Sequence, residues 1–247
     1  MLTLCPAHAW ASSPERLVIA AAVTLGFALL ARTLRGVNRS GAIAGGLACF
    51  LLFAGSGPTA FFMLATLFVM TWISTRLGYR RKLALGLAER REGRNAWQVS
   101  ANLSVAALGS VGFSVTGNRV WLVAAIAALT EAATDTVASE IGQYRRADAR
   151  FITTWQRVPA GTDGGITIPG SAAGLAAGLV IAAVAAAGGI LPKSQLWIPV
   201  AAGFAGMLID SILGATLQRR GWISNQTVNL VATLAAAALA CAILRFT

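Results

Sequence analysis

Long apolar runs separated by short polar segments dominate the chain. A helix needs about 20 apolar residues to cross the hydrocarbon core of a bilayer, and eight runs come close to that length. They lie at roughly 17–34, 41–56, 59–78, 96–116, 119–142, 168–190, 196–217 and 225–245. The pattern predicts an all-α fold, a polytopic transmembrane helix bundle with about eight spans. Because the second run is short and glycine-rich, seven spans plus a re-entrant hairpin is the alternative.

Composition favours a membrane protein and excludes several enzyme classes. Hydrophobic residues make up 56% of the chain and charged residues 12%, whereas soluble domains carry about 25% charged residues. Cys5, Cys49 and Cys241 form neither a CxxC nor a Cys/His pattern, which argues against a zinc site. His8 is the only histidine and lies near the N-terminus, which argues against Ser-His or Cys-His catalysis.

The distribution of basic residues predicts the orientation. The net charge is +11, but no RNA- or DNA-binding motif accompanies it, so no nucleic-acid partner is expected. Alternate loops carry 16 Lys and Arg residues against 4 on the other side, and the positive-inside rule places the basic side in the cytoplasm. We therefore expect an N-terminal segment 1–16 and one integral-membrane domain 17–247 with cytoplasmic loops 79–95 and 143–167. Both termini would lie outside the cytoplasm, and a bacterial inner membrane is the expected location.

Acidic residues inside predicted spans are the first candidate chemistry. An acid at mid-bilayer costs about 2.5–3.5 kcal/mol even on insertion scales. Asp135 and Asp210 each lie about seven residues from the cytoplasmic end of a span, which is about 10 Å deep at 1.5 Å per residue. Glu131, Asp135 and Ser139 share one helical stripe. Carboxylates at one depth predict a site for a hard cation such as Mg²⁺, with Asp135, Asp210 and Glu140 as ligands. The alternative is that each acid pairs with an Arg or a backbone donor and joins two helices.

The segment VPAGTDGGITIPGSAAG (158–174) is the second candidate. Its glycines and Pro159 rule out a continuous helix, so it is predicted to be a turn-rich loop. Successive N–H groups of such a loop, together with the N-terminus of the next helix, can cradle a phosphate. The residues expected to do so are Gly161, Thr162, Gly164 and Gly165. Asp163 would fit if a metal bridged carboxylate and phosphate, although an ordinary interhelical turn is the default reading.

These polar segments all fall at the predicted cytoplasmic ends of spans. A one-sided cluster of acids, basic residues and glycine turns predicts an active site that faces the cytosol, with a lipid substrate entering from the inner leaflet. A transport path would also place polar groups at the midplane and on the far side.

Three segments carry a family resemblance: ATDTVASEIG (133–142), VPAGTDGGITIPGSAAG (158–174) and GMLIDSILGATLQ (206–218). They resemble the integral-membrane family that contains the phytyl-phosphate kinases of chloroplast tocopherol synthesis, over roughly residues 36–230. The resemblance implies transfer of a phosphoryl group from a nucleoside triphosphate, CTP being favoured, to an isoprenyl monophosphate. More distantly, the family is similar to polyprenol kinases and CDP-diacylglycerol synthases, which also use CTP and a divalent metal.

That chemistry assigns roles to the candidate residues. Phosphoryl transfer depends on positioning and charge neutralisation, so Asp135, Asp163, Asp210 and Lys82 are the predicted catalytic residues, with Mg²⁺ as cofactor. Predicted contacts to nucleotide or lipid phosphate are Asn38, Ser40, Arg94, Gln98, Asn102, Ser139, Arg157 and Gln218. For the basic residues the alternative is an ordinary positive-inside charge.

Two other functions stay open at this point. A cytidylyltransferase that makes a CDP-activated lipid would share the metal, nucleotide and lipid phosphate, but it would release pyrophosphate where a kinase releases CDP. A small-anion transporter would consume no nucleotide. The sequence also leaves open the prenyl chain length, the nucleotide preference and the oligomeric state.

Overall fold

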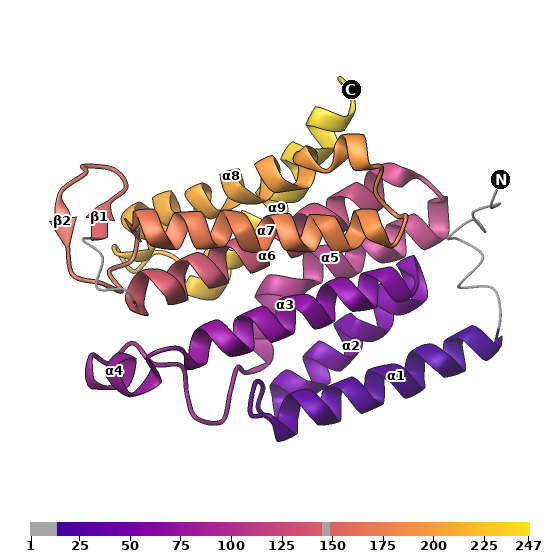
Figure 1. Ribbon diagram of the computed structural model, residues 1–247, viewed down its shortest axis with the longest axis horizontal. Coiled ribbons are helices and arrows are strands. Elements are labelled where there is room, and N and C mark those ends of the chain that lie inside the picture. Colours follow the sequence, from indigo (N-terminus) through magenta and orange to yellow (C-terminus); the bar gives the residue numbers. More distant parts are fainter. Residues whose placement is uncertain (1–13, 145–148) are drawn as a thin grey trace.

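The computed structural model describes residues 14–144 and 149–247, and these are nearly all helical (Figure 1). The long helices are α1 (Pro14–Thr33), α2 (Arg39–Ser56), α3 (Pro58–Arg76), α5 (Ala96–Thr116), α6 (Arg119–Tyr144), α7 (Ile168–Ala187), α8 (Trp197–Leu213) and α9 (Asn225–Leu244). The short elements are α4 (Tyr79–Ala84), a 3₁₀ turn (Lys193–Gln195), a π-helical turn (Gly214–Gln218) and the strands β1 (Ala149–Phe151), β2 (Arg157–Val158) and β3 (Gly165–Ile166).

Eight helices in the described part of the chain are long and apolar enough to cross a membrane. They coincide with the eight predicted runs, so the predicted fold class, a polytopic helix bundle, is confirmed. The second run forms one continuous helix, α2, and not a re-entrant hairpin. Residues 1–13 of the predicted N-terminal segment and residues 145–148 of the predicted loop 143–167 lie outside the described residues.

Polar side chains begin each long helix that starts at the end of the bundle where α4 and the short strands lie. Asn38 caps α2, Thr167 caps α7 and Ser224 caps α9, each accepting a hydrogen bond from a backbone N–H of the first turn. Asn95 caps α5 and forms a capping box with Gln98. Such caps satisfy N–H groups that the helix itself leaves unpaired. Several polar residues of this end are therefore explained by helix initiation.

Helix α6 is the central element, and it packs against α3, α5, α7, α8 and α9. Its closest neighbour is α7, whose Gly170, Gly174 and Gly178 recur every four residues on the face toward α6. A Cβ atom at Gly174 would lie 2.5 Å from the carbonyl oxygen of Thr134. The small residues thus let the two backbones approach closely, as is typical of membrane helices, and this fixes the position of the acid-bearing segment of α6.

Replacing Gly174 with Ala is expected to lower the free energy of unfolding by about 1–3 kcal/mol, because the added methyl group meets backbone that has no room to move. Gly26 on α1 is the matched control, since nothing lies within 4 Å of a Cβ built there. Gly26→Ala should be neutral or stabilising by up to about 1 kcal/mol, the helix propensity of Ala over Gly. Thermal unfolding in detergent measures both, and equal midpoints for the two variants would contradict the close α6–α7 packing.

A small antiparallel sheet occupies part of the loop that the sequence predicts only as turn-rich. The strand order is β2-β1-β3, and Arg150 of β1 pairs with Arg157 on one side and Ile166 on the other. In Figure 1 this sheet and α4 lie at one end of the bundle, whereas α1 begins and α9 ends at the opposite end. The sheet end is the one that the positive-inside rule assigns to the cytoplasm; that assignment stays a prediction.

Candidate active site

A polar cavity of about 370 Å³ opens at the sheet end of the bundle. Its walls come from the segment before α5, from α5, α6, α8 and α9, and from the loop between β2 and β3. The predicted site residues that line it are Arg94, Gln98, Asn102, Asp135, Ser139, Glu140, Gly161, Thr162, Asp163, Gly164, Gly165, Asp210 and Gln218. Residues far apart in the sequence therefore meet in one concavity, although their chemical roles stay predictions.

Three carboxylates face one another across this polar cavity. Asp135 on α6 and Asp210 on α8 are half-buried, and Asp210 is close enough to both Asp135 and Asp163 for their carboxyl groups to interact electrostatically. The surrounding hydrogen-bond partners assign the amide orientation of Asn229 on α9. In this orientation its nitrogen lies 2.9 Å from the Asn225 carbonyl oxygen and 3.3 Å from Asp210 Oδ2, and its oxygen lies 3.2 Å from Asn102 Nδ2. An amide donor thus supports the Asp210 carboxylate from the side of α9.

The acids suit Mg²⁺ by chemistry, but they do not form a complete site by themselves. Within residues 14–144 and 149–247, no three His, Cys, Asp or Glu side chains are arranged to hold a metal ion. Mg²⁺ commonly binds through one or two carboxylates while water and substrate phosphate complete its octahedron. Asp135, Asp163 and Asp210 fit that pattern, so a magnesium site here would need a phosphate ligand.

Residues 161–165, which we call the glycine loop, pack directly against the π-helical turn that follows α8. Gly164 has a φ of +76°, which favours glycine. A Cβ there would lie 2.6 Å from the backbone nitrogen of Ala215, so no larger residue fits without moving one of the two segments. Single π turns inside α-helices often occur at functional sites. This contact brings Asp163 and Asp210, on different elements, to the same cavity.

Partial burial raises the pKa of Asp163 above its ordinary value, while the charge of Arg219 and a side-chain hydrogen bond from Gln218 act in the opposite direction. Asp163 therefore keeps its proton to a higher pH than a free aspartate does. A divalent cation at this carboxylate would compete with that proton. The affinity of Asp163 for the cation should therefore rise as the pH rises through the pKa of Asp163.

Backbone hydrogen bonds hold Arg94 at the edge of the cavity. Asn38 N–H donates to the Arg94 carbonyl oxygen at 3.0 Å, and Arg94 N–H donates to the Gly36 carbonyl oxygen at 3.1 Å. The Ser40 hydroxyl donates to Asn38 Oδ1 at 3.0 Å and accepts from Ala96 N–H at 3.2 Å. Asn38 and Ser40, both predicted substrate contacts, do not line the cavity. Their contacts indicate that they position Arg94 instead.

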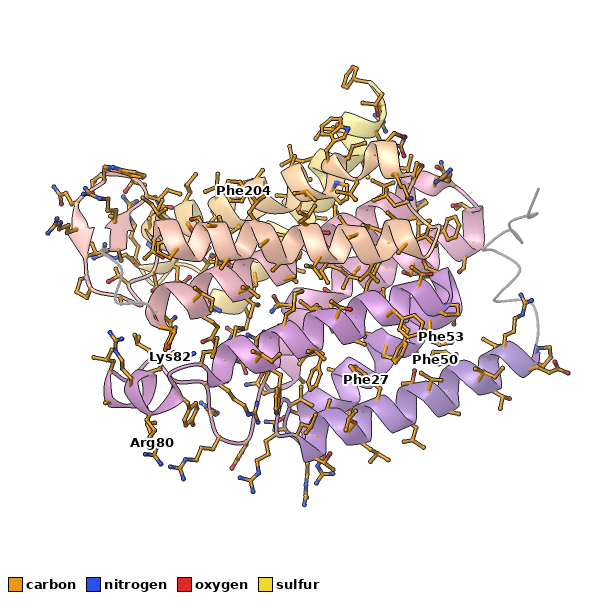
Figure 2. All side chains as sticks on the ribbon, in the orientation of Figure 1. Phe27, Phe50, Phe53, Arg80, Lys82 and Phe204 are labelled. Carbon is orange, nitrogen blue, oxygen red and sulfur yellow. The ribbon has the colours of Figure 1, made fainter. Side chains whose placement is uncertain are left out.

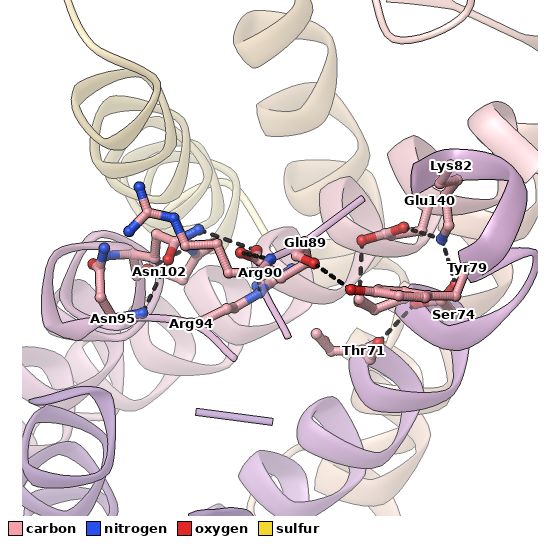
Figure 3. A network of polar contacts seen from close by, with 12 residues as sticks. Thr71, Ser74, Tyr79, Lys82, Glu89, Arg90, Arg94, Asn95, Asn102 and Glu140 are labelled. Carbon is pink, nitrogen blue, oxygen red and sulfur yellow. Dashed lines mark hydrogen bonds and ion pairs between the residues drawn. The ribbon is translucent and has the colours of Figure 1, made fainter. Parts of the chain in front are cut away.

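Glu89 orients the Arg94 side chain, as Figure 3 shows. Its Oε2 atom lies 3.8 Å from Arg94 Nε and accepts a hydrogen bond from Gln98 Nε2 at 3.1 Å. Tyr79 donates its hydroxyl to the Glu89 carbonyl oxygen at 3.2 Å. Asp135 is also close enough for its charge to interact with Arg94. The guanidinium thus interacts with both Glu89 and Asp135, and both acids line the cavity.

Lys82 and Glu140 form a buried ion pair, which Figure 3 shows. Lys82 is 1% exposed and also donates to the Ser74 carbonyl oxygen at 3.1 Å, while Thr75 donates to Glu140 Oε1 at 3.0 Å. Lys82 does not line the cavity, nor does Arg157 in β2. The ion pair gives Lys82 and Glu140 a structural role, although Glu140 also lines the cavity. The phosphate contact of Lys82 and the metal contact of Glu140 stay predictions.

Lys82→Met is expected to lower the free energy of unfolding by about 3–5 kcal/mol, because Glu140 is left as an uncompensated buried charge. The double variant Lys82→Met with Glu140→Gln should recover most of that loss, since the remaining amide can still accept from Thr75. Thermal unfolding and nucleotide turnover are measured on both variants. Wild-type stability with lost turnover in the double variant would assign the pair to catalysis instead.

Sequence reasoning missed several polar residues that line the cavity: Glu89, Thr136, Gln143, Ser171, Ser211, Asn225, Gln226 and Asn229. Asn225 and Asn229 carried a usable signal, because they are polar residues four apart at the start of the last apolar run. Glu89 carried none, since one acid in a basic loop is normally solvated. The Oε1 atom of Gln143 is buried and has no hydrogen-bond partner in the described part of the chain.

Comparisons with known proteins agree on one family. The family described as "Integral membrane protein DUF92" matches residues 22–237. An uncharacterised membrane protein of Synechocystis sp. is 31% identical over 196 residues, which cover 77% of this chain and 76% of that protein. One of Methanocaldococcus jannaschii is 30% identical over 222 residues, covering 89% and 90%. The chloroplastic protein VTE6 of Arabidopsis thaliana is 30% identical over 209 residues, covering 79% and 62%. No solved structure matches the chain.

Proposed function

The chain belongs to the integral membrane family DUF92, and from that premise we propose that it is a kinase that transfers a phosphoryl group from a nucleoside triphosphate to an isoprenyl monophosphate. One observation carries the proposal: Asp135, Asp163, Asp210, the glycine loop and Arg94 line a single polar cavity. The likeness to a chloroplast protein and the motifs shared with phytyl-phosphate kinases support this choice of reaction.

The reaction requires little covalent help from the protein. An oxygen of the lipid monophosphate attacks the γ-phosphorus, the bond from that phosphorus to the β–γ bridging oxygen breaks, and the nucleoside diphosphate leaves. Positioning and charge neutralisation supply most of the catalysis of such transfers. In this cavity Arg94 would bind and orient the phosphate that accepts the group, and N–H groups of residues 161–165 would hold the donor phosphates.

The three aspartates would coordinate a divalent cation. Asp135, Asp163 and Asp210 provide the hard oxygen ligands that Mg²⁺ prefers. When bound with the triphosphate, Mg²⁺ neutralises phosphate charge. Asn229 and Asn102 would keep the Asp210 carboxylate in place. A cavity of about 370 Å³ lies within the usual range of ligand pockets, roughly 300–1,000 Å³. We propose CTP as the donor.

Product analysis tests this proposal against its rivals. The purified protein in detergent is incubated with Mg²⁺, an isoprenyl monophosphate and CTP labelled at either the α- or the γ-phosphorus. A kinase moves the γ label to a prenyl diphosphate and leaves the α label in CDP. Formation of pyrophosphate and an α-labelled lipid would establish a cytidylyltransferase instead. Anion flux in sealed vesicles without nucleotide consumption would establish a transporter.

A further inference from the structure

A second and larger cavity, of about 550 Å³, lies between α1, α2, α3 and α5. Within the membrane-spanning region its walls are mainly small or apolar, and they include Phe27 and Ala31 of α1, Gly45 of α2, and Leu64 and Phe68 of α3. Along α3 the lining runs from Leu64 to Arg76, a length of about 18 Å at 1.5 Å per residue. The Phe27 and Phe68 rings meet edge to face with centroids 5.4 Å apart. We call this space the apolar cavity.

Basic residues line one end of the apolar cavity. They are Arg35, Arg76, Arg80, Arg90, Arg91 and Arg94. Figure 2 shows Arg80 on α4 at the sheet end of the bundle, whereas Phe27 on α1 lies nearer the middle of the bundle. The guanidinium of Arg76 is held 4.1 Å above the ring of Trp72. The cavity therefore combines an apolar interior with a strongly cationic mouth, which suits an anionic amphiphile with a long hydrocarbon tail.

The two cavities meet at a common wall. Five residues line both of them: Glu89, Arg94, Gln98, Asn102 and Thr136. Arg94 belongs to both the cationic mouth of the apolar cavity and the acid-lined polar cavity. A ligand in the apolar cavity can therefore present its head group at Arg94, beside the place where the donor triphosphate is proposed to bind.

We propose that the apolar cavity binds the isoprenyl tail of a lipid monophosphate and that the phosphate of this lipid is bound at Arg94 on the common wall. The inference rests on the proposed function and adds to it the binding site of the lipid substrate. A neutral lipid would bring no negative charge to the arginines of the mouth, and a free phosphate would leave the apolar interior unused. Charge complementarity and apolar length together favour one occupant, a long-chain lipid monophosphate.

A matched pair of glycine variants tests the tail site. Gly45 lines the apolar cavity, and a Cβ there would lie 3.6 Å from Val99 Cγ1, an ordinary contact that needs no backbone shift. Gly45→Leu therefore adds a side chain within the cavity wall. Gly26 of α1 does not line the cavity, and nothing lies within 4 Å of a Cβ there, so Gly26→Leu is the control.

The readout is photo-cross-linking with a diazirine-bearing geranylgeranyl monophosphate, without nucleotide. In the wild-type protein, labelled peptides should come from α1 and α3 at the lining positions. Gly45→Leu should weaken apparent binding about tenfold or more, because overpacking removes the space for the tail, and Gly26→Leu should leave it unchanged. Unlabelled geranylgeranyl monophosphate should compete, whereas geranylgeraniol should not.

Several results would overturn the tail site. They are labelling that maps to other surfaces, equal competition by the alcohol, absence of saturable labelling, and equal binding by the two variants. The positions of the labelled peptides in the wild-type protein test the proposal without any variant. The proposal can therefore be rejected even if the Gly45→Leu protein misfolds. Specific labelling in the apolar cavity with no phosphoryl transfer from any nucleotide would leave the tail site standing and reject the kinase. Prenyl diphosphate formation with labelling elsewhere would support the kinase and reject the tail site.

Discussion

Asp210→Asn and Asp135→Asn should each lower the rate of prenyl diphosphate formation by roughly 10²–10³-fold, the usual cost of removing one charged or polar group that stabilises a transition state. Both side chains line the polar cavity, and their carboxyl groups are close enough to interact electrostatically. Asn keeps the shape of Asp but loses the charge that would attract Mg²⁺ bound to the triphosphate. The measurement is the initial rate of γ-label transfer at saturating Mg²⁺.

Glu131 provides a matched acid-to-amide control. It is 1% exposed and lies one helical turn from Asp135, but it does not line the polar cavity. Glu131→Gln should therefore stay within a few-fold of the wild-type rate, provided that its thermal midpoint is unchanged. If Glu131→Gln lost as much activity as Asp210→Asn, the effect would be a general one of charge removal. Wild-type turnover in both aspartate variants would end the metal assignment.

Arg94→Ala is the second substitution with a large expected effect. Arg94 lies on the wall shared by the two cavities, so its removal should raise the KM for the lipid monophosphate and lower kcat, with a combined loss of roughly 10²–10³-fold in kcat/KM. Arg94→Lys should be intermediate, because lysine keeps the charge but lacks the planar fork that binds two phosphate oxygens together. Steady-state kinetics with the lipid varied at saturating nucleotide separates the effect on KM from the effect on kcat.

Arg119 gives the control for a change of charge alone. It begins α6 at the end of the bundle opposite the sheet, and it lines neither cavity. Arg119→Ala should keep wild-type kinetics. An Arg94→Ala protein that is folded and retains its KM for the lipid would contradict the placement of the lipid phosphate at the common wall.

The sequence predicted the spans well, because they follow from a local pattern. Hydropathy over about 20 residues identifies a membrane helix without knowledge of its neighbours. The equal distances of Asp135 and Asp210 from their span ends gave a common depth, and the structure places both side chains in one cavity. The glycine run of α7 likewise predicted close packing before its partner helix was known.

Features that depend on which helices touch were not predictable in the same way. Lys82 and Glu140 pair across 58 positions, and only the fold turns two apparent site residues into a buried ion pair. Asn38 was singled out for its polarity at a span end, although its role as a helix cap and backbone donor explains that polarity without substrate. Nothing in the amino-acid sequence indicated the apolar cavity, because residues such as Ala31 and Leu64 are common in any membrane helix.

The most direct measurement is an experimental structure of the protein in lipid nanodiscs with Mg²⁺, a non-hydrolysable CTP analogue and a long-chain isoprenyl monophosphate. The expected result is triphosphate density in the polar cavity between Asp135, Asp210 and residues 161–165. The lipid phosphate should lie at Arg94 and its tail between α1 and α3. Nucleotide bound away from these acids, or Asp135 and Asp210 on separate sides of the bundle, would contradict the central claim that one shared site performs phosphoryl transfer.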